Sequence, residues 1–167
     1  KYAPNGDTIW VRRYNSPNDG DEWASALAVD NGGNVYVTGR SWNGHDFEVG
    51  TYYDYVTIKY APNGDTVWVR SYNGPFGNGG DYGSALAVDD NENVYVTGYG
   101  FDGGTSSDYV TIKYAPNGDT MWVRRYNGPG NSHDAASSLL MDEYGNVYVT
   151  GASAGSGTSS DYATIKY

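Results

Sequence analysis

The stretch that decides the fold is DYVTIKYAPNGDTMWVRRY, residues 108–126. Two runs rich in β-branched and aromatic residues flank the tetrapeptide PNGD, and runs of this composition are typical of β-strands. Proline presets its own φ angle, and asparagine and glycine both tolerate a positive φ, so PNGD favours a tight hairpin turn. The stretch therefore predicts two antiparallel strands joined by a short turn.

This stretch belongs to an internal repeat. The phrase KYAPNGDT begins at Lys1, Lys59 and Lys113, and the first two letters of a fourth copy stand at Lys166, so the spacings are 58, 54 and 53 residues. Two further phrases recur in order between these copies: ALAVD or its variants at residues 26, 85 and 138, and NVYVTG at residues 34, 93 and 146. Four short strands per unit of about 40–50 residues is the period of a β-propeller blade.

Composition excludes several classes of protein. The chain has 167 residues, enough for one domain, with 20 acidic residues against 10 lysines and arginines and a formal net charge of -10. Binding to a phosphate backbone needs clustered positive charge, so we expect no nucleic-acid partner. Only 38% of the residues are hydrophobic and they form no long apolar run, so we expect no membrane span. The absence of cysteine excludes disulfides and thiolate metal sites.

The order of strands within a blade follows from side-chain size and charge. Positions near the propeller axis must be small because blades taper inward, so residues 83–87 and 24–26 fit an innermost strand. The arginine-bearing segment around Trp68 fits the outermost strand, because charge protects an edge strand from pairing with other chains. This order predicts one all-β propeller domain over residues 1–167, with an outermost strand at 7–14, full blades at 22–72 and 81–126, and a last blade at 134–167 that lacks its outermost strand.

The displaced strand predicts how the chain is completed. Three blade-equivalents per chain are fewer than the roughly four to eight blades of closed propellers. We interpret the last blade as completed by the N-terminal outermost strand, residues 7–14, of another chain. Two chains would then form a six-bladed ring with C₂ symmetry, whereas exchange that does not close would form an open array or filament. A third arrangement, a piece of a longer propeller, is equally open.

The repeated phrases carry a family resemblance. Residues 108–114, 118–130 and 142–151 are similar to the SBBP-type β-propeller repeats of secreted and cell-surface bacterial and archaeal proteins. The resemblance extends over nearly the whole chain in three copies. It implies a propeller fold and an extracellular or cell-surface location. It implies no defined activity, and therefore no catalytic residue is carried over.

Candidate binding residues lie in the connections that differ between copies. The PNGD turns and the turns around residues 89–93 are nearly uniform and share one face, whereas the connection 39–54 is five residues longer than its counterparts 98–108 and 151–161 on the other face. Aromatic rings beside asparagine and aspartate suit sugar rings. The candidate ligand-binding residues are Trp42, Asn43, His45, Asp46, Phe76 and Phe101. The alternative is that these rings anchor the loops or contact another chain.

The sequence offers little support for a metal site or a catalytic site. The acidic run 89–92 lacks the spacing of a calcium-binding loop, and an Asx-type turn explains it better, so we expect no metal site. His45-Asp46 and His133-Asp134 are the only histidine–acid pairs. Ser132 adjoins His133, but neighbours in sequence seldom face each other, so neither pair has a positioned nucleophile. We expect no catalytic residues and no cofactor.

These observations predict a non-enzymatic extracellular scaffold that assembles with itself through strand exchange, as a closed ring or an open fibre. The alternative function is a lectin-like module that binds glycans or cell-surface proteins with its variable loop face. A third hypothesis, an enzyme, would need acids and histidine clustered at the axial mouth.

Overall fold

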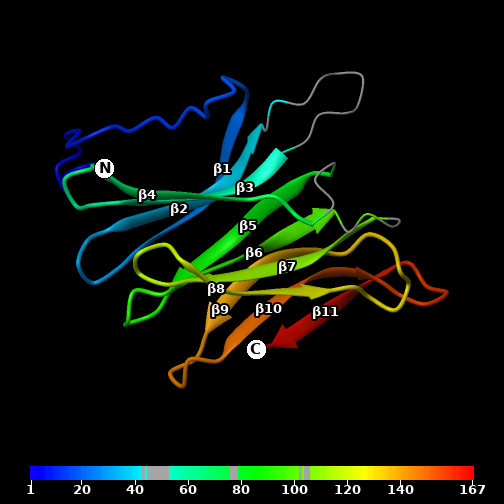
Figure 1. Cartoon of the computed structure of the whole chain (residues 1–167). Coiled ribbons are helices and arrows are strands. Elements are labelled where there is room, and N and C mark those ends of the chain that lie inside the picture. Colours follow the sequence, from blue (N-terminus) through cyan, green and yellow to red (C-terminus); the bar gives the residue numbers. More distant parts are fainter. Residues whose placement is uncertain (43, 45–52, 76–78, 102, 104–105) are drawn as a thin grey trace.

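The computed structural model describes residues 1–42, 44, 53–75, 79–101, 103 and 106–167. Its strands form three stacked antiparallel sheets (Figure 1). The first sheet contains β1 (Glu22–Val29), β2 (Val35–Trp42), β3 (Tyr53–Tyr60) and β4 (Thr66–Tyr72). The middle sheet contains β5 (Asp81–Val88), β6 (Val94–Phe101), β7 (Ser107–Tyr114) and β8 (Thr120–Tyr126). The last sheet contains β9 (Ala135–Met141), β10 (Val147–Ala154) and β11 (Ser160–Lys166).

The prediction of an all-β fold with four-stranded antiparallel sheets is confirmed, and the described residues contain no helix. Strands follow the chain order within each sheet, so every connection is a hairpin. The sheets lie one after another, with the first and last sheets at opposite ends of the stack and no closure within one chain (Figure 1).

The PNGD hairpins form as their residues dictate. Between β3 and β4, Gly64 adopts a φ of 89° and its N–H donates to the Ala61 carbonyl at 2.8 Å. The Asn63 side-chain oxygen accepts the Asp65 N–H at 3.0 Å, which is the local bond that favours asparagine in a turn. The same bonds recur in the turns at residues 3–7 and 115–119.

The glycine of the VYVTG phrase is required by a close backbone approach. The register of β1 shifts between Ala24 and Ala26, and here a Cβ at Gly39 would clash with the Trp23 carbonyl. The middle sheet has the same shift, with Gly98 against the carbonyl of Tyr82. The bulge and the glycine therefore recur as one feature of each sheet.

Stacking explains why the apolar residues do not alternate along the strands. In β6 and β7 nearly every residue is buried, since the first sheet covers one face of the middle sheet and the last sheet covers the other. The first strand of the middle sheet, β5, contacts the first strands of both neighbouring sheets, β1 and β9. Their predicted place nearest a propeller axis stays a prediction.

The N-terminal segment runs beside the first sheet (blue in Figure 1). Residues 7–14 have no strand neighbour in the single chain, apart from a bridge between Tyr2 and Thr8. A strand needs a partner for its backbone groups, so the predicted outermost strand is not formed here, and its exchange stays a prediction. No helix of the described part is long and apolar enough to cross a membrane.

Candidate functional site: two unpartnered sheet faces

A tyrosine and a tryptophan of the first sheet form hydrogen bonds to main-chain carbonyls of the middle sheet. The Tyr55 hydroxyl crosses from β3 and donates to the Val110 carbonyl at 2.9 Å. The Trp68 indole N–H donates to the Pro116 carbonyl at 3.0 Å, and its ring lies 6.0 Å from that of Tyr114. Burial raises the pKa of the Tyr55 hydroxyl well above its usual value, so this group remains a donor at neutral pH.

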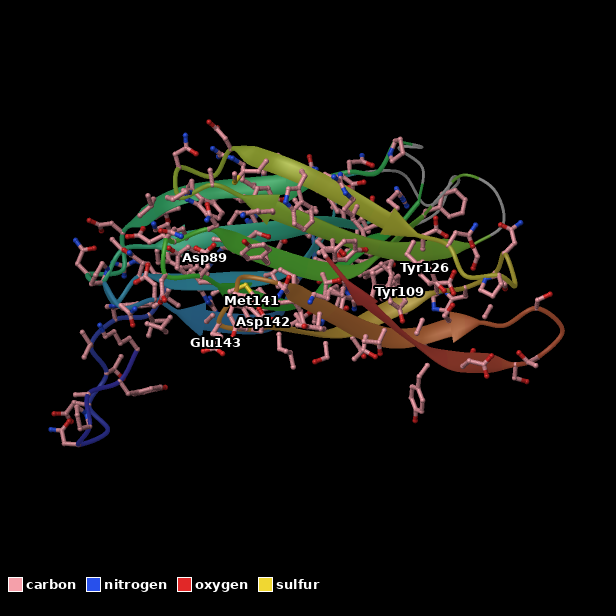
Figure 2. The ribbon with its side chains drawn as sticks, turned by 90° about the horizontal axis from the view of Figure 1, so that it is seen from below. Asp89, Tyr109, Tyr126, Met141, Asp142 and Glu143 are labelled. Carbon is pink, nitrogen blue, oxygen red and sulfur yellow. The ribbon has the colours of Figure 1, made fainter. Side chains whose placement is uncertain are left out.

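The contact between the middle and last sheets repeats that pattern. The Tyr109 hydroxyl donates to the Ala163 carbonyl at 3.2 Å, and the rings of Trp122 and Tyr167 lie 5.8 Å apart. Figure 2 shows Tyr109 beside Tyr126, whose rings meet at 5.5 Å on the side of the last sheet. Burial raises the pKa of Tyr109 to about 12. Each sheet thus presents the same tyrosine and tryptophan to the apolar face of the next.

The first sheet has an apolar face with no sheet before it. This face, which we call the head face, holds a groove of about 560 Å³. The corresponding side chains of the middle sheet, Leu86 and Val88, are partly buried against the core, whereas on the head face Leu27 is 68% exposed and Val29 is 58% exposed. The groove is lined, among others, by Leu27, Val35, Val37, Val56 and Ile58.

Part of the head face is covered by the N-terminal segment. The Trp10 indole N–H donates to the Pro62 carbonyl at 3.1 Å, and its ring lies 6.2 Å from that of Tyr60. The Arg12 Nε donates to the Gly64 carbonyl at 2.6 Å. Trp68 and Arg70 of β4 make the same bonds to the middle sheet. The N-terminal segment therefore occupies, beside the first sheet, the position that β4 occupies beside the middle sheet.

The last sheet has the opposite open face, which we call the tail face. Tyr162 stands at the position of Tyr55 and Tyr109, but it is 96% exposed where those two are fully buried. Leu140 on the same sheet is 60% exposed. β11 pairs with β10 on one side, and the sheet order ends there, so no described strand takes the place that β4 and β8 hold. The tail face therefore lacks both a covering sheet and an outermost strand.

Charge is arranged across the sheet contacts. The Lys59 ammonium, almost buried, lies 2.8 Å from the Glu92 carboxylate on the turn of the middle sheet. Burial opposes the charged form, but the bonds to Glu92 and Tyr36 outweigh it and raise the pKa of Lys59. This pair was not predicted from the sequence, because nothing local shows that residue 59 meets residue 92.

The structure places two of the sequence-predicted site residues. Trp42 packs on Gly20 and Phe101 packs on Gly79, where a Cβ on either glycine would clash with the ring. Both rings thus contact the connection that precedes the innermost strand of their own sheet. The other four, Asn43, His45, Asp46 and Phe76, lie outside the described residues.

An aromatic row on the same side was not predicted. The Arg40 guanidinium lies over the rings of Trp23, Tyr53 and Tyr82, at 4.4, 5.1 and 5.2 Å from their centres. The Tyr82 ring stacks on Tyr99 at 4.8 Å, and Tyr99 meets His133 edge-on at 5.6 Å. Trp23 and Arg40, and likewise Tyr82 and Tyr99, are cross-strand neighbours within one sheet. Arg40 meets Tyr82, and Tyr99 meets His133, only because the sheets stack. The described residues contain no group of acids and histidines arranged to hold a metal ion.

Together, the repeated four-stranded antiparallel sheets and the two open faces define an all-β repeat protein of the propeller-like class. The comparison with family models agrees with this class. Residues 9–48 and 67–100 match the model of the SBBP beta-propeller repeat, and the resemblance inferred from the sequence is confirmed there. No curated protein matches the chain.

Proposed function

We propose that this chain is a non-enzymatic extracellular scaffold module that assembles with itself, head to tail, through exchange of its N-terminal segment. In this proposal the three sheets are propeller blades. Residues 7–14 of one copy pair with β11 of another and complete its last blade.

One observation carries the proposal. The N-terminal segment lies against the first sheet with the bonds of an outermost strand, through Trp10 and Arg12, yet it has no sheet of its own. At the other end of the chain, β11 has a sheet but no outermost strand. The N-terminal segment of one copy could pair with β11 of a second copy while it keeps its contacts with the first sheet of its own copy. The segment would then gain a strand neighbour, and β11 would gain an outermost strand.

The proposed contact is heterologous, because a head face meets a tail face. Two chains would give six blades in a closed ring, and a rotation that does not close would give a fibre. The apolar side chains on the two faces favour either assembly, since each large apolar side chain contributes about 1.5–3 kcal/mol on full burial.

Light scattering behind a sizing column tests the proposal. We expect a sharp dimer for a ring, or a large and polydisperse species for a fibre. An excess of a synthetic peptide of residues 1–15 should compete for β11 and reduce the mass of the assembly. The same peptide with Trp10 and Arg12 both changed to alanine should still pair with β11, but it should bind the first sheet of the next copy poorly. A stable monomer at all concentrations contradicts the proposal and favours a piece of a longer propeller.

A second candidate function is glycan or cell-surface protein binding on the variable loop face. The aromatic row of Trp23, Tyr82 and Tyr99 around Arg40 favours it, because flat rings beside a cation suit acidic sugars. A glycan array with the wild type and with the Trp23→Ala and Trp42→Ala variants tests this function. The absence of any glycan signal, or a signal that neither variant lowers, contradicts it.

A further inference from the structure

We infer that the tail face of one copy docks on the head face of a second copy as a third repeat of the internal sheet contacts, with Tyr162 in the groove and its hydroxyl donating to the carbonyl of Val56 of the second copy. This inference rests on the proposed function and names the residues of the contact.

The acceptor is identified by the two contacts inside the chain. The Val110 carbonyl accepts the Thr97 hydroxyl of its own sheet at 3.3 Å and the Tyr55 hydroxyl of the preceding sheet at 2.9 Å. The Ala163 carbonyl likewise accepts the hydroxyls of Thr150 and Tyr109, each at 3.2 Å.

Val56 is the third member of this series. Its carbonyl accepts the Thr38 hydroxyl at 3.1 Å, and no described tyrosine of the chain donates to it. Tyr162 is the third tyrosine of the series and is exposed. Its strand, β11, lies at the opposite end of the stack from the first sheet (Figure 1). Donor and acceptor are therefore each left over at one end of the chain, and only a second copy brings them together.

If the contact between two copies repeats the contacts inside one chain, Lys166 of the first copy faces position 33 of the second. Lys166 corresponds to Lys59, whose ammonium binds Glu92, and Gly33 corresponds to Glu92. Gly33 and Glu92 both have a positive φ, 80° and 62°, so the backbone at position 33 already has the conformation in which glutamate occurs in the middle sheet. The wild-type contact lacks this ion pair because residue 33 is glycine. A glutamate at this position should therefore strengthen the contact between copies.

Gly33→Glu is the first test. With a zero-length carbodiimide, the assembled variant should yield covalent dimers joined between position 33 and Lys166, identified by mass spectrometry, and it should assemble more tightly than the wild type at low salt. Gly145→Glu is the matched control, because it offers Lys113 the same pair inside one chain and should produce no covalent dimer through that pair. The Lys59–Glu92 link serves as an internal positive control for the reagent.

Truncation of Tyr162 is the second test. We expect Tyr162→Ala to weaken assembly by at least about tenfold and Tyr162→Phe by about threefold to tenfold, because the first removes a buried ring and the second only a hydrogen bond. Tyr144→Ala, at an exposed turn position, should change assembly little. Circular dichroism checks that the variants fold.

The outcomes separate the two proposals. If the wild type assembles but neither position 33 nor Tyr162 affects it, strand exchange stands and the docking of these two faces is wrong. If the wild type is a monomer at every concentration and Gly33→Glu forms no covalent dimer, both proposals are wrong.

Discussion

Asp81 shows how one position in the repeat acquires different properties in different sheets. Its Oδ2 accepts the Gly74 N–H at 2.8 Å, whereas its Oδ1 is buried and has no hydrogen-bond partner among the described residues. At the same position in the last sheet, both oxygens of Asp134 accept main-chain N–H groups, from Gly128 at 2.6 Å and Ala154 at 2.8 Å. Burial raises the pKa of Asp81 to about 6, and the Gly74 bond only partly offsets this.

This pKa predicts a pH-dependent stability. The pKa of Asp81 is higher in the folded chain than its ordinary value of 3.8, so its stabilising contribution is present below about pH 4 and is lost as the pH rises through about 6. Asp81→Asn keeps an acceptor for Gly74 and cannot ionise. We expect it to raise the free energy of unfolding by about 1–2 kcal/mol at pH 7.5 and to leave it nearly unchanged at pH 4.

Urea unfolding at the two pH values measures this effect. Asp90→Asn is the control, since it removes one charge from a chain of net charge -10 at an exposed position. If both variants gain the same unfolding free energy at pH 7.5, the effect comes from net charge, and the proposed role of Asp81 is wrong.

The turn that follows each innermost strand is built on one aspartate. The Asp89 Oδ1 accepts the N–H groups of Asn91 and Asn93 at 2.9 and 2.8 Å, and its Oδ2 accepts the Asn93 side chain at 2.7 Å and the Tyr95 hydroxyl at 3.2 Å. The Asx-type turn expected from the sequence is thereby confirmed. Asp89 and Asp142 lie at corresponding turns of their sheets (Figure 2).

Removal of this aspartate should open the turn. Burial acts to raise the pKa of Asp89, but the hydrogen bonds outweigh it and hold the pKa below its usual value. We therefore expect Asp89→Ala to lose about 1–3 kcal/mol of unfolding free energy at pH 7. The loss should shrink as the pH falls through the lowered pKa of the wild-type carboxylate. Chemical denaturation compares it with Asp90→Ala, and equal losses in the two variants would show that the turn bonds contribute nothing specific.

Elements of this kind were predictable because their causes are local. The strands, the PNGD hairpins and the Asx turns each depend on residues within one hairpin. Arg70 was predicted only to protect an edge strand, yet its Nε donates to the Gly118 carbonyl of the next sheet at 2.7 Å. That role, like the approach of Arg40 to the Tyr82 ring, depends on which positions of separate sheets meet, and no local pattern records it.

In the molecule as a whole, the first and middle sheets each present a tyrosine and a tryptophan to the sheet that follows, and the middle and last sheets receive them. Two such contacts are formed inside the chain, and the halves of a third are left at its two ends. A head-to-tail contact of this kind leads to a ring or to a fibre according to the rotation between copies. The next experiment is chosen to separate the two.

A covalent tandem of two copies distinguishes ring from fibre. When residues 1–165 precede a second full copy, the seam reads DYATIKYAPNGDTIWVRRY, which matches the natural seams at residues 54–72 and 108–126, so β11 would receive its outermost strand in the same chain. If two chains close a ring, we expect the tandem to have the mass of one tandem chain in light scattering, at every concentration, and to melt at a higher temperature than the single copy, because association no longer limits its stability. If the assembly is a fibre, the tandem should still polymerise. A tandem that stays monomeric but melts no higher than the single copy would show that the two ends do not meet.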